Sequence, residues 1–126
     1  MALRSRLRPL SIPLTGAAFA AALLLAGALP ADAAGAKTRA AEIITTRGCS
    51  ACHFVPGIPQ AVGTLGPSLK GFSSRPRIAA GRLENTEENL RRWLQNPKAV
   101  LPATMMPNLG LNDEEISVLV EFLQTL

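Results

Sequence analysis

The sequence predicts one small all-α domain that folds around an apolar object which the chain does not itself supply. Two amphipathic helices are marked at their starts by capping residues, Asn85 and Asn112. Between Phe54 and Asn85 the chain has five Gly and four Pro, with neither strand alternation nor a long helical period. A segment of that length inside so small a domain is typical of a chain that wraps something.

The first 33 residues have the pattern of a secretory signal. Three arginines precede an apolar or small-residue run from Leu14 to Leu29, and an A-x-A site follows and predicts cleavage after Ala33. The alternative is a retained membrane anchor, although the run is shorter than the roughly 20 residues of a spanning helix. We therefore expect a signal peptide at 1–33 and an exported, periplasmic domain at 34–126, which would be membrane-anchored if the leader is retained.

Three helices are expected in the mature chain. The first covers about 38–48, because its apolar residues recur with a period of 3.6. The second runs from Asn85 to Asn96, with Glu88 completing a capping box and a proline ending the helix. The third opens at Asn112, with Glu115 at the reciprocal capping position, and turns one apolar stripe toward a core.

The residues that carry chemistry are Cys49, Cys52 and His53, which stand at the end of the first predicted helix. Two thiols three positions apart can each add to a vinyl group of one porphyrin, and the adjacent imidazole can bind the iron from one face. This C-x-x-C-H pattern is the attachment signature of a c-type haem. We expect one haem c, held covalently through Cys49 and Cys52, with His53 on the iron.

Three other kinds of site could use these residues. A thioredoxin-like dithiol would be expected in a βαβ context, and no strand is predicted before Cys49. Zinc needs four ligands, and the chain has two Cys and a single His. A disulfide from Cys49 to Cys52 would close a tiny loop and stabilise little. Haem is favoured, and a cofactor-free thiol-disulfide protein stays as a remote alternative.

A second iron ligand is offered by Met105 and Met106, which precede Pro107. A thioether is a soft ligand that favours Fe(II) and raises the potential. Both methionines could instead fill gaps in the core, which is how methionine is usually employed. Because the chain has no second His, we expect a methionine ligand, and the chemistry leaves the choice between the two open.

In order, the motifs resemble those of a small class I monohaem cytochrome c. They are Cys49-x-x-Cys52-His53, Gly66-Pro67-Ser68-Leu69, Trp93-Leu94-x-Asn96-Pro97, Met106-Pro107 and a closing amphipathic helix. The stretch from Ser74 to Trp93 is similar in particular to the haem-c domain fused to the copper-A subunit of some bacterial cytochrome oxidases. The resemblance covers about Glu42 to Leu123 and implies an all-α fold wrapped around one covalently bound haem.

This resemblance also implies roles for single residues. Met106, which is followed directly by proline, would be the distal iron ligand. The Pro67 carbonyl would accept the proton on the far nitrogen of His53 and so fix its tautomer. Arg75 and Trp93 are candidates to contact the haem propionates. Trp93 could equally be part of the core, and Arg75 could equally be solvated surface.

The predicted function follows from an iron with both axial positions filled by protein. Such an iron has no open site for a substrate, so we expect an electron carrier and not an enzyme. It would exchange electrons with respiratory membrane complexes such as a terminal oxidase, as a monomer that docks transiently. No copper-binding domain accompanies the module in this sequence, which favours a free-standing relative; the alternative is a permanent haem-c subunit of a larger oxidoreductase.

Charge is unevenly distributed along the mature chain. Residues 34–82 hold seven basic residues and one acidic residue, whereas residues 83–126 hold three basic and seven acidic residues. The basic half surrounds the attachment motif, which suggests a positive face near the haem edge that meets an acidic partner. Nucleic acid is not an expected partner, because no stacking aromatic residues accompany a basic stripe.

Overall fold

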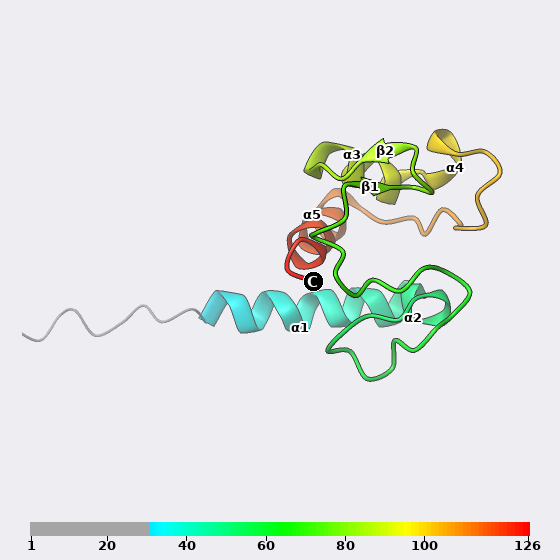
Figure 1. The fold of residues 1–126 in the computed structure, drawn as a ribbon. Helices are drawn as coiled ribbons and strands as arrows, with labels where there is room; N and C mark the ends of the chain where they lie inside the picture. The colour runs from blue at the N-terminus through cyan, green and yellow to red at the C-terminus, as the bar shows by residue number, and fades with distance from the viewer. Residues whose placement is uncertain (1–30) are drawn as a thin grey trace, which may run out of the picture.

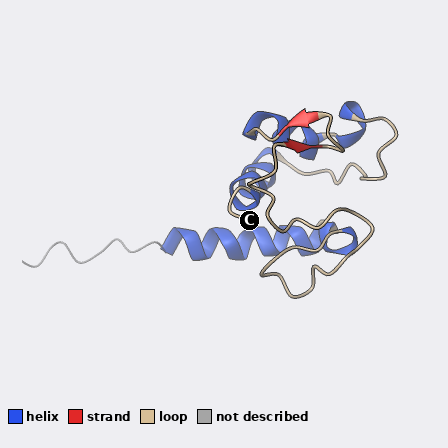
Figure 2. Ribbon diagram, in the orientation of Figure 1, coloured by secondary structure: helices blue, strands red, loops and turns tan. Residues whose placement is uncertain are grey.

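The computed structural model describes residues 31–126, in which long loops join three main helices (Figures 1 and 2). These helices and loops surround a cavity. The helices are α1 (Ala31–Thr46), α2 (Cys49–Cys52), α3 (Glu87–Gln95), α4 (Pro97–Val100) and α5 (Asp113–Leu123), and the strands are β1 (Arg77–Ile78) and β2 (Leu83–Glu84). The predicted all-α class is confirmed. The predicted leader, up to residue 30, lies outside the described residues.

The first and last helices of this part of the chain, α1 and α5, cross and pack on each other (Figure 1). The apolar residues with helical spacing are fully buried there: Ile43, Ile44, Leu119 and Val120. α1 begins earlier than the predicted start at Thr38 and ends at Thr46, just before Gly48. Gly48 has a φ of 80°, which favours glycine and turns the chain into α2. Between residues 31 and 126 no helix has the length and apolarity to cross a bilayer.

A paired charge joins α1 to α5. Arg47 Nε and Nη2 donate to the two carboxylate oxygens of Glu115 at 2.9 and 3.0 Å. Glu115 is only 6% exposed. Its side chain also accepts from Asn112 N at 3.0 Å, while Asn112 Oδ1 accepts from Glu115 N at 2.9 Å, which confirms the predicted capping box. The Asn112 amide first, and then Arg47, hold the pKa of Glu115 below its ordinary value.

The predicted cap of α3 is wrong by one residue. Thr86 caps this helix, because its hydroxyl accepts from Asn89 N at 3.2 Å. The Asn85 side chain instead donates to the carbonyls of Phe72 and Arg75 at 2.9 and 3.0 Å. Both residue types favour N-caps, so local pattern alone does not distinguish them.

The end of α3 also differs slightly from the prediction. The helix stops at Gln95, and Asn96 becomes the cap of α4 by accepting from Ala99 N at 3.2 Å. Pro97 is the first residue of α4, a position where its missing N–H costs nothing. Pro97 therefore starts a helix as well as ending one.

The long connection contains a small hairpin that the sequence analysis missed. Ile78 pairs with Leu83 across two antiparallel strands of two residues each. Strands this short leave no alternation to detect. Ala79 and Ala80 have φ values of 52° and 53°, in the left-handed region that is unfavourable for residues with a Cβ.

Glu115→Gln is expected to flatten the pH dependence of stability in acid. Since the folded-state pKa lies below the ordinary value of about 4.3, the carboxylate stabilises the fold above that pH. This stabilisation is lost as the pH falls through the lowered pKa. Urea unfolding midpoints of the haem-loaded protein, measured from pH 7 into the acid range, should fall more steeply for the wild type than for the variant.

Glu114→Gln is the matched control, because Glu114 is an exposed neighbour on the same turn of α5. Its pH profile should follow that of the wild type. Equal slopes for the two variants would show that the Arg47–Glu115 pair contributes no pH-dependent stability.

Candidate functional site

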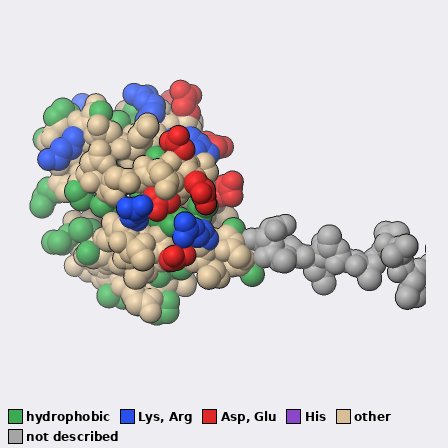
Figure 3. Space-filling model, turned by 180° about the vertical axis from the view of Figure 1, so that it is seen from behind, with side chains coloured by type: hydrophobic (Ala, Val, Ile, Leu, Met, Phe, Trp, Pro, Cys, Tyr) green, Lys and Arg blue, Asp and Glu red, His purple; other side chains and the backbone are tan. Residues whose placement is uncertain are grey.

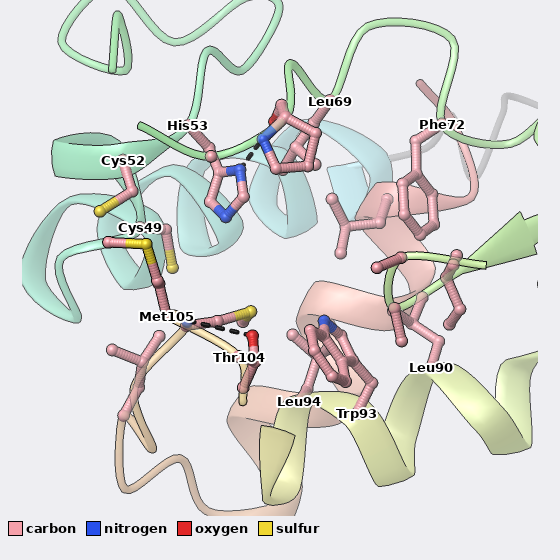
Figure 4. A pocket seen from close by; sticks show the side chains of 18 of the residues that line it. Cys49, Cys52, His53, Leu69, Phe72, Leu90, Trp93, Leu94, Thr104 and Met105 are labelled. Atoms are coloured by element: carbon pink, nitrogen blue, oxygen red, sulfur yellow. Dashed lines mark hydrogen bonds between the residues drawn. The ribbon is translucent and has the colours of Figure 1, made fainter. Parts of the chain in front are cut away.

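A cavity of about 680 Å³ opens between the helices and the long loops (Figure 4). Its walls are mostly aliphatic and aromatic, and they come from every main helix and from the hairpin. The lining side chains include Ile44 of α1, Ile78 of β1, Leu90 and Leu94 of α3, and Leu119 and Leu123 of α5. A large concave apolar space with few polar groups is the usual form of a ligand or cofactor site.

Cys49, Cys52 and His53 lie together on one wall of this cavity (Figure 4). The two cysteines are the ends of the single turn α2, and both thiols are free and half-buried. His53 N donates to Cys49 O at 2.9 Å, so the turn places the imidazole directly after the second thiol. Burial raises the pKa of the Cys49 thiol.

The imidazole of His53 is oriented by a backbone carbonyl. Its Nδ1 lies 2.7 Å from Pro67 O, and a carbonyl can only accept, so Nδ1 carries the proton. This is the contact that the resemblance implied. Figure 4 shows the other ring nitrogen facing into the cavity. With Nδ1 as the donor to Pro67, the other nitrogen is the one through which the imidazole can bind a metal ion.

Two glycines that the sequence analysis did not place in the site allow this arrangement. A Cβ on Gly66 would lie 2.5 Å from Cε1 and 2.7 Å from Nδ1 of the His53 ring. A Cβ on Gly63 would lie 2.5 Å from the backbone carbonyl carbon of Cys52. Only glycine permits so close an approach to the attachment turn. In the sequence, the feature that could have indicated this role for Gly66 is its position directly before Pro67.

The methionines line the same cavity but differ in how they are held. Met106 is partly buried and packs against the core, and its backbone N–H donates to Thr104 Oγ1 at 3.2 Å. The Met105 side chain is 93% exposed. Of the two thioethers, that of Met106 is the one restrained by its surroundings.

Trp93 and Arg75 also line the cavity. Trp93 lies on α3, and Figure 4 shows its indole nitrogen turned toward the interior of the cavity. Arg75 is held within its own loop, because Nη2 donates to the carbonyls of Ser68 and Lys70, the latter at 3.0 Å. Its guanidinium also lies 5.8 Å from the centre of the Phe72 ring. The expected propionate contacts of Trp93 and Arg75 stay predictions.

Residues 38–126 match the sequence model of the family described as cytochrome c. The chain belongs to the cytochrome c family. Proteins of this family are electron carriers with one covalently bound c-type haem, and Cys49 and Cys52 fit their C-x-x-C-H attachment motif. The predicted recognition, fold class and cofactor are confirmed.

Named relatives of this cytochrome c include oxidase subunits and cytochromes c2. Cytochrome c oxidase subunit 2 of Bacillus sp. (strain PS3) is 37% identical over 89 residues, which are 68% of this chain and 25% of the relative. Cytochrome c2 iso-2 of Magnetospirillum molischianum is 33% identical over 88 residues, or 62% of this chain and 90% of the relative. Cytochrome c2 of Rhodomicrobium vannielii is 30% identical over 94% of this chain and 97% of the relative. The chain spans about a quarter of the length of the oxidase subunit.

The residues present fit a covalently bound haem. The cavity is apolar, two thiols and an imidazole acceptor stand on one wall, and a restrained thioether lines the same space. Family membership argues against the cofactor-free dithiol alternative. The raised pKa of Cys49 argues the same way, because reactive dithiols depend on a lowered thiol pKa.

Gly66→Ala is expected to displace the His53 ring, because its Cβ would overlap the imidazole. Overpacking of this kind typically costs about 1–3 kcal/mol. The denaturant midpoint of the haem-loaded protein should fall, and its haem absorption spectrum should differ from that of the wild type. Gly35→Ala is the control, since a Cβ there has no neighbour within 4 Å. A normal spectrum and midpoint for Gly66→Ala would contradict the need for glycine beside the ring.

Proposed function

We propose that this cytochrome c is a periplasmic one-electron carrier with His53 and Met106 as axial ligands, which exchanges electrons with a respiratory membrane complex such as a terminal oxidase. One observation carries the proposal: an imidazole nitrogen and a restrained thioether line one apolar cavity together with two free thiols. When bound, the haem supplies reversible exchange between Fe(III) and Fe(II).

The side chains of this chain do three things around that chemistry. Cys49 and Cys52 would tether the haem, so that it does not dissociate in either oxidation state. Pro67 fixes the proton of His53 on Nδ1 and leaves the other nitrogen for the metal. The aliphatic walls exclude water and keep the surroundings similar in both oxidation states, which favours fast electron exchange.

The choice of Met106 rests on burial and attachment. Its backbone is tied to Thr104 and its side chain packs on the core, whereas Met105 stands in solvent. An axial ligand must be held in place, because the iron–thioether bond is weak and a mobile side chain would lose conformational entropy on binding.

Spectra of Met105→Ala and Met106→Ala test this choice. In haem-loaded protein the thioether-to-ferric-iron charge-transfer band should vanish only in Met106→Ala, since only that variant loses the ligand. Met105→Ala serves as the matched control, because it removes the same side chain one position away. Loss of the band in Met105→Ala alone would reverse the assignment.

The periplasmic location is supported by the basic, apolar and small-residue pattern of residues 1–33, and an oxidase partner is supported by the name of a relative. That relative is itself an oxidase subunit, which keeps a second candidate open: a haem-bearing subunit held permanently in a larger complex. Size-exclusion of a native membrane extract separates the two. A free carrier elutes near its own mass of 13.3 kDa or below, and a subunit elutes with the complex.

Partner docking is proposed at the mouth of the cavity. Within residues 31–126 the exposed large hydrophobic side chains are Phe54, Val62, Leu65 and Met105. Leu65 and Met105 line the main cavity, and Phe54 and Val62 line a second hollow of about 240 Å³. We define the two exposed residues of the main cavity, Leu65 and Met105, as the apolar rim.

The distribution of charge supports one orientation of the apolar rim during docking. Figure 3 shows hydrophobic side chains along the left edge of the molecule and acidic side chains, with basic ones among them, toward the right. The acidic residues include those in the first turns of α3 and α5. These acidic turns line neither hollow, so a negatively charged partner repels them and the apolar rim is the favoured contact. Apolar contact at the rim then supplies a small, transient interface.

Leu65→Ser is expected to weaken docking by about fivefold, since roughly 1 kcal/mol of apolar burial is lost. The strength of docking is measured by the second-order rate constant of electron transfer to a purified terminal oxidase. The ratio of wild-type to variant rates should be the same at low and high salt, because apolar contact is not screened. Gln95→Ser is the control, because Gln95 is exposed and uncharged and lines neither hollow. An unchanged rate for Leu65→Ser would place docking elsewhere.

A further inference from the structure

The segment from Gly66 to Arg75 begins at the imidazole of His53. Gly66 N donates to Cys52 O at 2.8 Å, and Pro67 O accepts from His53 Nδ1 at 2.7 Å. This start of the segment therefore sets both the position of the ring and the strength of its hydrogen bond.

Arg75, at the other end of the segment, folds back on it. Its Nη2 donates to the carbonyl of Ser68, the residue directly after Pro67, and to that of Lys70 at 3.0 Å. The guanidinium also covers the ring of Phe72. Because one nitrogen of Arg75 binds both carbonyls, the segment forms a closed loop. This loop depends on the position of the Arg75 backbone.

Asn85 holds that backbone from the far side of the hairpin. Its Nδ2 donates to Phe72 O at 2.9 Å and to Arg75 O at 3.0 Å, so both amide hydrogens are used on the segment. Its own N–H donates to Pro76 O at 3.0 Å, and its Oδ1 accepts from Gln124 Nε2 at 3.4 Å. Asn85 thus fixes the end of the segment to the hairpin and to the C-terminal residues.

We propose that Asn85 is a positioning residue for the axial imidazole: through Arg75 it holds the Pro67 carbonyl on His53 and thereby tunes the reduction potential. This rests on the proposed ligation of the iron by His53. A stronger hydrogen bond at Nδ1 makes the imidazole more basic, which stabilises Fe(III) and lowers the potential. Because Asn85 is uncharged, its removal changes the potential through geometry and not through lost charge.

The test compares Asn85→Ala with Asn89→Ala in haem-loaded full-length protein. Asn89 is a matched control, because its Nδ2 also donates to a backbone carbonyl, Glu84 O at 3.1 Å, outside the Gly66–Arg75 segment. Two quantities are measured: the reduction potential by spectroelectrochemical titration, and the hydrogen exchange rate of His53 Nδ1–H by NMR of the diamagnetic reduced protein.

In Asn85→Ala the potential should rise and the Nδ1–H exchange rate should increase about five- to thirty-fold, the factor expected for one or two lost hydrogen bonds. In Asn89→Ala both should match the wild type, although the unfolding midpoint falls in both variants. A lower midpoint in Asn85→Ala with unchanged potential and exchange would overturn the proposal and leave Asn85 as a structural residue.

Arg75→Lys provides the same test if Asn85→Ala does not fold. It keeps the positive charge but shortens the reach to Ser68 and Lys70, so potential and exchange should shift in the same directions. Unchanged values would again overturn the proposal. Failure of the His53 ligation itself looks different, because the wild-type Nδ1–H resonance would then lack the shift that a directly bound haem imposes.

Discussion

Apolar side chains of α1, α3 and α5 line a cavity of about 680 Å³ instead of closing entirely on one another. A domain of this size buries a limited share of its surface, and here part of what it buries faces the cavity. The haem of the cytochrome c family supplies that centre. The loops, the hairpin and the glycines then form a cavity wall whose shape follows that of a rigid ligand.

That wall positions His53 and Met106 through backbone atoms more than through side chains. The orientation of His53 depends on the Pro67 carbonyl and on the absence of a side chain at Gly66. Met106 is held by its own amide on Thr104 and by core packing. Irregular backbone serves this purpose better than helix, because in a helix the N–H and C=O groups are already used.

The sequence predicted those features whose physics is local. The C-x-x-C-H turn and the Asn112–Glu115 capping box each lie within five residues, and residue type and spacing suffice to predict them. Asn85 was assigned to the wrong role, because its partners Phe72 and Arg75 come from a segment that no local pattern connects to it. The hairpin and the close contact of Gly66 with His53 likewise depend on tertiary structure. Spacing can propose a methionine ligand, but burial is what distinguishes Met106 from Met105.

The bond between Arg47 and Glu115 ties the attachment turn to the far end of the chain. Its partners are 68 residues apart, and Arg47 lies two residues before the first cysteine of the attachment turn. Closing so long a loop carries an entropic penalty, which the packing of α1 on α5 offsets. A loosening of α5 would therefore also release the residue that leads from α1 into the attachment turn.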